Sequence, residues 1–305
     1  MRKKKIQQIL SNVAKPILES MNRNKILTLI LFIAFFVRIL GLYPNFINHP
    51  DEGWVQTYSG KLFYNIITKG DFDPHTYKYG SFIFYLGAIP YFPVIIITYV
   101  LELTQNIFFP IFQLSTPSSL KEYVIHGGIE QHTILIFWLQ RLNVAILGGL
   151  SVLMLYLIVK KLLNRPTALL ASLFLAVMPL HVRDSHYIST DVPFTFFILL
   201  SMFCMVNLFK SSKWKWYLLS GLTIGFSFTV RYFPVAILLY PISILFDPKK
   251  NIYWFLKVIL GVIFIPIGVF LGLPYIFLTP SNISVFNADL AKWVWPWYTT
   301  SISSY

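Results

Sequence analysis

The sequence predicts an all-α polytopic membrane protein, a prediction that depends on composition, on long apolar runs and on the spacing of basic residues. Of the 305 residues, 56% are hydrophobic and only 12% are charged, and the mean hydropathy is +0.65. Soluble proteins carry about a quarter of their residues as Asp, Glu, Lys or Arg, so lipid must face much of this surface. The 28 Phe, 18 Tyr and 8 Trp suit a protein with aromatic belts at the membrane surfaces.

The net charge of +13 is interpreted as a sign of membrane topology rather than of nucleic-acid binding. The basic residues occur in short blocks between apolar stretches, as the positive-inside rule expects of cytoplasmic loops. The blocks are residues 2–5, Lys160 with Lys161 and Arg165, residues 210–215, and Lys249 with Lys250. We therefore expect membrane lipids, and no nucleic acid, among the partners.

The predicted elements follow in order from these patterns. Residues 1–24 place apolar residues at helical spacing among Lys, Gln and Asn, which predicts a basic amphipathic helix on the cytoplasmic face. The first span is expected at 25–47. Further spans are expected near 139–159, 167–181, 193–209, 217–230, 232–246 and 252–273. With the basic blocks inside, residues 48–79, 181–192, the turn near Arg231 and residues 274–305 lie outside.

The apolar stretch at residues 81–114 cannot make a single crossing, because the spans on both sides of it meet the outer face. Pro90 and Pro93 interrupt it where a kink or break is expected. Two alternatives remain open: a helical hairpin, or a segment that lies in the outer interface.

A carboxylate pair, Asp51 and Glu52, directly follows the first span. Residues 53–68 then keep apolar residues at mixed helical spacing, which predicts an interfacial helix. Asp51 either N-caps this helix or acts as a general base held at the membrane surface, and the two roles are compatible.

The second external segment, residues 181–191, contains two His, one Arg and two Asp between short apolar spans. One interpretation is a solvated turn that starts the next helix at Asp191, and the other is a second functional loop. No thiol and no regular ligand repeat supports a metal site here. No metal ligand is assigned and no cofactor is expected, except that a divalent cation is left open.

Three arginines, Arg38, Arg141 and Arg231, interrupt apolar stretches. A cation at the bilayer centre costs roughly 2.5 to 3.5 kcal/mol on insertion scales, so each is expected near an interface or beside an anionic partner. For Arg38 and Arg231 the alternatives are snorkelling to lipid headgroups and gathering with Lys78 around an anionic substrate group.

The order of the motifs resembles that of GT-C glycosyltransferases, over about residues 25–290. Arg38 in the first span is followed by motifs similar to the first external loop of that superfamily, at residues 49–52, 70–74 and 77–82. The later motifs agree, at residues 141–149, 179–183, 185–193 and 221–231. The resemblance is to the phospholipid-carrier-dependent branch, which includes protein O-mannosyltransferases and the lipid A aminoarabinose transferase.

This resemblance implies a GT-C-like transmembrane helix bundle with interfacial helices in the first external loop. Such enzymes lie in the cell membrane as multi-pass proteins, with the active site facing outside. They move a sugar, with inversion, from a polyprenyl-phosphate donor to a hydroxyl of a lipid, glycan or protein acceptor of the cell envelope. The implied catalytic residues are Asp51 as the base, Glu52 and Asp191. The implied ligands of the donor phosphate are Lys78, Arg231, His186 and Arg38.

The resemblance also divides the chain. Residues 1–24 precede a catalytic module at 25–290 with external loops 48–79 and 181–192, and residues 291–305 form an external aromatic segment. Members usually continue with further spans, so we expect either a fragment or an unusually short or inactive relative. Two other classes are alternatives. A transporter or flippase of lipid-linked sugars would place ionisable groups near the bilayer midplane, and a non-catalytic assembly subunit would use the carboxylate pair only to cap a helix.

Overall fold

The computed structural model describes most of the chain, and all regular structure in the described part is helical. The described residues are 25–42, 49–77, 80–108, 120–125, 133–211, 213–232, 254–279, 281–284 and 287. No strand occurs among them. The predicted all-α class is confirmed. The predicted amphipathic helix at 1–24, the predicted span at 232–246 apart from its first residue, and the aromatic segment at 291–305 lie outside the described residues.

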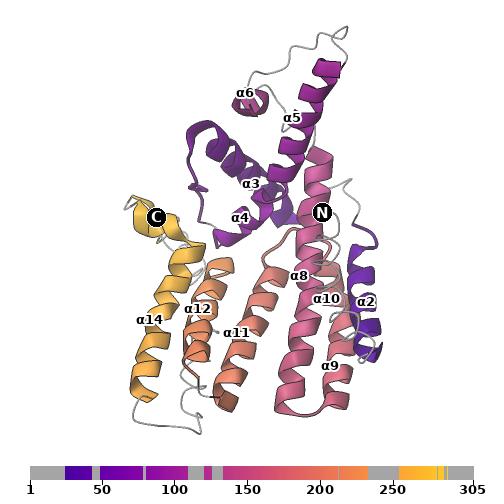
Figure 1. The fold of residues 1–305 in the computed structure, drawn as a ribbon, viewed down its shortest axis with the longest axis vertical. Helices are drawn as coiled ribbons and strands as arrows, with labels where there is room; N and C mark the ends of the chain where they lie inside the picture. Colours follow the sequence, from indigo (N-terminus) through magenta and orange to yellow (C-terminus); the bar gives the residue numbers. More distant parts are fainter. Residues whose placement is uncertain are drawn as a thin grey trace, which may run out of the picture.

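A bundle of long helices forms the larger part of the molecule (Figure 1). Its members are α2 (Lys25–Ile39), α8 (Thr133–Leu162), α9 (Arg165–Val177), α11 (Asp191–Ser211), α12 (Trp214–Val230) and α14 (Trp254–Gly272). α8 contacts α2, α9 and α11, and α12 packs between α11 and α14. The helices thus form a continuous bundle in which α9 packs on α2 and α8, whereas α11 packs on α8 and α12.

Several helices are long and apolar enough to cross a membrane, which confirms the polytopic class. Within the described residues these stretches are Phe82–Leu101, Ile134–Leu162, Asp191–Leu208 and Trp254–Gly272. The last three fall on predicted spans. α2, α9 and α12 are shorter but lie at predicted spans within the same bundle, and α2 ends at Ile39, eight residues before the predicted end at 47. Large apolar side chains on the outer face of α14, including Phe255, Ile263 and Phe270, are exposed, as lipid-facing side chains would be.

The stretch at residues 81–114 contains two helices, α4 (Phe82–Ala88) and α5 (Tyr91–Phe108). Ile89, which joins them, keeps helical backbone angles, and the chain changes direction at the predicted break. α5 then leads away from the bundle, and α6 (Leu120–Ile125) packs beside it and beside α3 (Figure 1). Residues 82–108 therefore form no helical hairpin, which removes the first of the two alternatives for this part of the stretch.

A short second layer covers one end of the bundle. It is built on α3 (Pro50–Lys69), the interfacial helix that the sequence predicts, and on α4, which packs against it. Buried Val55 and Phe84 of these helices share an apolar core with Phe137 of α8 and with Ile188. This core places the start of the first external loop beside the segment at 185–190.

Two of the four basic blocks have described residues, and both lie at the opposite end of the bundle from α3. Lys160, Lys161 and Arg165 stand where α8 turns into α9, and Lys210 and Lys213 stand where α11 turns into α12. Figure 1 shows both of these turns at the end far from α3. Two loops that the sequence places on the cytoplasmic side therefore share one end of the bundle.

Candidate active site

The first turn of α3 presents the carboxylate pair. His49 is the N-cap, because its side chain accepts a hydrogen bond from the amide of Asp51 at 3.2 Å, and Pro50 occupies the first helical position. The amide of His49 in turn donates to Oε2 of Glu52 at 3.4 Å, which completes a capping box. The prediction that Asp51 itself caps the helix is wrong. Asp51 is the second residue of the helix, where its negative charge interacts favourably with the positive end of the helix dipole. Its side chain is 22% exposed.

Glu52 is fully buried and is held by two other parts of the chain. Nε of Arg141 donates to its Oε1 at 2.9 Å, and a terminal nitrogen of the same guanidinium donates to its Oε2 at 2.9 Å. The amide of Ile188 donates to Oε1 at 3.1 Å. Such a two-point arginine contact fixes both direction and distance. Glu52 thus joins α3 to α8 and to the loop before α11.

These contacts bring the two predicted external loops together. Besides the bond between Glu52 and Ile188, the ring of His49 stacks on the ring of Tyr187 with 5.7 Å between ring centres. The residues on each side are more than 130 positions apart in the sequence. The expected convergence of the two loops, on which the predicted active site depends, is therefore present.

Arg38 contacts the start of the 181–191 segment, at His181, and is completely buried. Its guanidinium donates to the carbonyl oxygens of Ala34, Leu175 and Ala176 at 2.8 to 3.0 Å, and its second terminal nitrogen lies 2.9 Å from Nδ1 of His181. The last turn of α9 leaves carbonyl groups without helical partners, and a cation there satisfies them. Burial, followed by the charge of Arg38, lowers the pKa of His181 to about 4, so its ring stays neutral and accepts this hydrogen bond.

His186 also contacts backbone rather than open solvent. Its Nε2 lies 2.7 Å from the carbonyl oxygen of Leu40, and its Nδ1 lies 2.8 Å from that of Val182. Carbonyl oxygens only accept hydrogen bonds. Two of the predicted phosphate ligands, Arg38 and His186, are therefore engaged in holding the second loop against α2 and α9.

Asp191 and Arg231 form an ion pair at the end of the bundle near α3. Asp191 begins α11 and Arg231 directly follows α12, and both side chains are 44% exposed. A predicted catalytic carboxylate and a predicted phosphate ligand are thus direct neighbours.

Lys78 lies outside the described residues, but Gly80 shows where the first external loop ends. A Cβ atom added to Gly80 would lie 1.8 Å from the carbonyl oxygen of Thr229 and 2.6 Å from the carbonyl carbon of Val230. The loop backbone therefore packs directly on the chain that leads into Arg231. Only glycine permits so close an approach.

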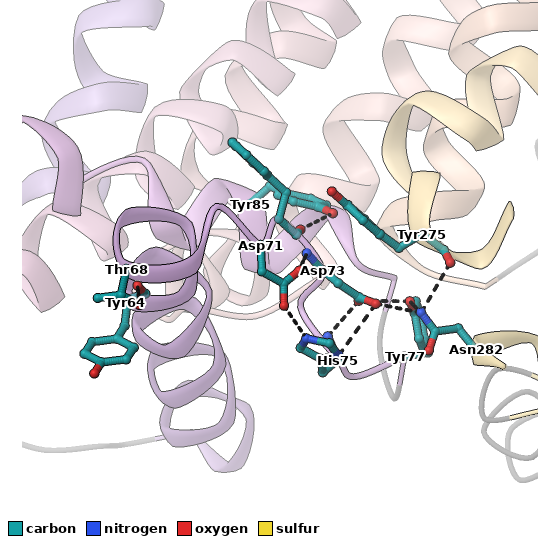
Figure 2. Close-up of polar contacts among 10 residues, drawn as sticks. Tyr64, Thr68, Asp71, Asp73, His75, Tyr77, Tyr85, Tyr275 and Asn282 are labelled. Atoms are coloured by element: carbon teal, nitrogen blue, oxygen red, sulfur yellow. Dashed lines mark hydrogen bonds and ion pairs between the residues drawn. The ribbon is translucent and has the colours of Figure 1, made fainter. Parts of the chain in front are cut away.

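The second half of the first loop forms a polar network that the sequence does not reveal (Figure 2). Asp73 is buried and bonds to Tyr77 and to Asn282, and Asp71 bonds to His75. The backbone amide of Asp73, followed by the side chain of His75, lowers the pKa of Asp71. Sequence reasoning missed Asn282, and it expected an anion as one alternative for Arg141 without identifying Glu52. For Arg141 a signal exists, since an arginine in an apolar stretch requires an anion.

Among the described residues, no group of three or more His, Cys, Asp or Glu side chains is arranged to hold a metal ion.

Residues 136–272 match the family model described as dolichyl-phosphate-mannose-protein mannosyltransferase, which is a family of the GT-C superfamily. The resemblance expected from the motifs is confirmed by this match, which supports a membrane glycosyltransferase that uses a lipid-linked sugar donor. The matched region includes Arg141, Asp191 and Arg231 and begins after Asp51 and Glu52. No curated protein and no solved structure gives a significant match.

Proposed function

We propose that this protein transfers a sugar from a polyprenyl-phosphate donor to an acceptor hydroxyl at the outer face of the membrane, with inversion and with Asp51 as the general base. The observation that carries the proposal is the contact of Glu52 with Arg141 and Ile188. This contact brings the helix turn of Asp51 beside the loop that leads to Asp191.

The proposed reaction needs a base near the acceptor and positive charge near the leaving group. The acceptor oxygen forms a bond to the anomeric carbon while the bond from that carbon to the phosphate oxygen breaks. Asp51 takes the hydroxyl proton, a contribution of roughly 10² to 10⁴ in rate. The electron pair of the broken bond leaves on the lipid phosphate, whose charge a cation in a poorly hydrated site stabilises.

We assign the phosphate to Arg231 and Lys78. Arg231 is half-exposed and its partner Asp191 is equally exposed, so a phosphate can reach the guanidinium. Gly80 of the same loop packs on the backbone of Thr229, which supports a short distance in space between this loop and Arg231. Asp191 then orients Arg231 through their ion pair.

Glu52, Arg38 and His186 act in this proposal as positioning residues. Both oxygens of Glu52 already accept hydrogen bonds, and the terminal nitrogens of Arg38 already bind protein groups. A group so engaged would leave its partners unsatisfied in a buried place if it turned to a substrate, which costs about 1 to 3 kcal/mol for each group.

The outer-face location rests on the basic blocks. The turns with Lys160, Lys161 and Arg165 and with Lys210 and Lys213 lie at the end of the bundle far from α3, which by the positive-inside rule supports an outer location for α3 and Asp51.

The experiment that tests the proposal presents the whole protein in vesicles with a panel of radiolabelled polyprenyl-phosphate sugars and with acceptor membranes. The same sugars as nucleotide donors serve as the control. We expect label to move from a polyprenyl-phosphate donor only, and the anomeric configuration of the product to be inverted. Transfer from nucleotide sugars would contradict the proposal. Movement of the sugar-lipid across the vesicle membrane without formation of a glycosylated product would also contradict it.

A further inference from the structure

Asp73, Tyr77 and Asn282 form a closed set of hydrogen bonds between the first external loop and the chain after α15 (Pro274–Leu278) (Figure 2). The amide nitrogen of Asn282 donates to Oδ2 of Asp73 at 2.6 Å and to the hydroxyl of Tyr77 at 2.8 Å. The hydroxyl of Tyr77 donates to Oδ1 of Asp73 at 3.1 Å. The same Asn282 nitrogen approaches the carbonyl oxygen of Tyr275 at 3.3 Å.

The loop side of this contact is buried and internally ordered. Asp73 is 3% exposed and Tyr77 is 1% exposed, so each needs its hydrogen-bond partners. The amide of His75 donates to Oδ1 of Asp73 at 2.9 Å, and the amide of Asp73 donates to Oδ1 of Asp71 at 2.9 Å. His75 has a φ of 52°, in the left-handed region that non-glycine residues rarely adopt. A carboxylate at position 73 therefore organises the turn and binds Asn282 at the same time.

The loop has a second fixed point three residues after Tyr77. Gly80 packs against the backbone of Thr229 and Val230, at the end of α12. The chain between Tyr77 and Gly80 thus begins at a contact with Asn282 and ends at a contact beside Arg231.

We infer that Asp73, Tyr77 and Asn282 are positioning residues for the phosphate of the lipid-linked donor, because they fix one end of the loop that reaches Arg231. This inference deepens the proposed function and rests on it. Neither Asp73 nor Asn282 takes part in the chemistry. Without their contact, the loop stays anchored at Gly80 but is no longer held at Tyr77. The proposed phosphate ligands, Lys78 and Arg231, then meet the phosphate in a wider range of relative positions. The result is weaker donor binding.

Hydrogen exchange of the whole protein in lipid nanodiscs tests the contact itself. In Asn282→Leu, which keeps bulk and removes the donor, we expect the amides of residues 71–77 to exchange about tenfold faster, as expected from losing roughly one hydrogen bond. The matched control is Ser284→Ala, two residues further on, whose hydroxyl donates to the carbonyl oxygen of Ser281. Unchanged exchange at 71–77 in Asn282→Leu would overturn the inference.

A swapped pair separates this contact from general damage to the fold. In the double variant Asp73→Asn with Asn282→Asp, the amide and the carboxylate change places and the hydrogen bonds can reform with the donor reversed. We expect exchange at 71–77 to return toward the wild-type rate. An exchange rate as fast as in Asn282→Leu would show that the pairing does not hold the loop, which contradicts the inference.

Binding of farnesyl phosphate, a short prenyl phosphate, tests the positioning role. We expect Asn282→Leu to raise its Kd about tenfold, and the swapped pair to lower it again. Wild-type binding with an unchanged Kd in Asn282→Leu would overturn the positioning role alone. An absence of binding to the wild-type protein would instead overturn the proposed function together with the role that depends on it, while the exchange result would still decide the contact.

Discussion

Two carboxylate–arginine pairs connect segments at the end of the bundle near α3, and they differ mainly in their exposure to solvent. Glu52 and Arg141 have side chains that are 0% and 2% exposed, and their contact has two parallel hydrogen bonds. Asp191 and Arg231 are each 44% exposed. Both pairs join segments that are distant in the sequence, but only the second is open to a ligand.

Exposure decides what each pair can do. Removing one member of a buried pair leaves a charge in a dry place, which costs about 3 to 5 kcal/mol. A surface pair contributes about 0 to 1 kcal/mol, because water and salt screen it. The first pair therefore supports the architecture, and the second can exchange a carboxylate for a phosphate at little cost.

The largest expected effect is on the buried pair. We expect Arg141→Leu to lower the free energy of unfolding by about 3 to 5 kcal/mol, because Glu52 would remain buried without its guanidinium partner. Thermal unfolding in detergent measures the change. The control is Arg183→Leu. Arg183 also pairs with a carboxylate, that of the neighbouring Asp184, but the arginine side chain is 62% exposed. Equal melting temperatures for the two variants would contradict the assigned difference.

A second buried contact of an arginine, between Arg38 and His181, makes the stability of the protein depend on pH. The pKa of His181 is lowered from 6.5 to about 4 by burial and by Arg38. Between pH 6.5 and pH 4, the unfolded chain therefore binds a proton at this residue and the folded protein does not. Stability is therefore full above pH 6.5 and is lost as the pH falls toward 4.

Between pH 6.5 and 5 this loss amounts to about 2 kcal/mol. Melting temperatures of the wild type and of His181→Gln over that range measure it. We expect the slope to be smaller in the variant, and parallel curves would show that His181 is not the group responsible.

The exposed pair should respond through the donor rather than through stability. We expect Arg231→Gln to raise the KM for the lipid-linked donor about tenfold, which corresponds to about 1.4 kcal/mol of lost binding, and to shift the melting temperature by little. Arg183→Gln, an exposed arginine of the second loop, is the control. A melting temperature lowered as far as in Arg141→Leu would place Arg231 among the structural cations.

The sequence predicts the elements well because they depend on local chemistry. Apolar length and basic blocks indicate the bundle, and the Pro and the carboxylates after residue 49 indicate the start of α3. The approach of the two external loops is implied only by the resemblance, because it depends on contacts between distant residues.

The partners of the charged residues are harder to predict. Arg141 in an apolar stretch requires an anion, but nothing local selects Glu52 rather than another carboxylate. Two of the four partners of Arg38 are carbonyl oxygens at the end of α9, which no side-chain pattern reveals. Asn282 is one polar residue in a segment that the sequence predicts to be external, and only the fold brings it to Asp73.

The adjacent residues Asp51 and Glu52 carry the central claim, which is that one supplies the chemistry and the other holds it in place. The most direct measurement is the rate of sugar transfer by Asp51→Asn, normalised to folded protein, beside Asp184→Asn, whose side chain is 21% exposed against 22% for Asp51. We predict that Asp51→Asn lowers the rate by roughly 10² to 10⁴ at an unchanged melting temperature, and that Asp184→Asn stays near the wild-type rate. Transfer by Asp51→Asn at the rate of Asp184→Asn would contradict the account.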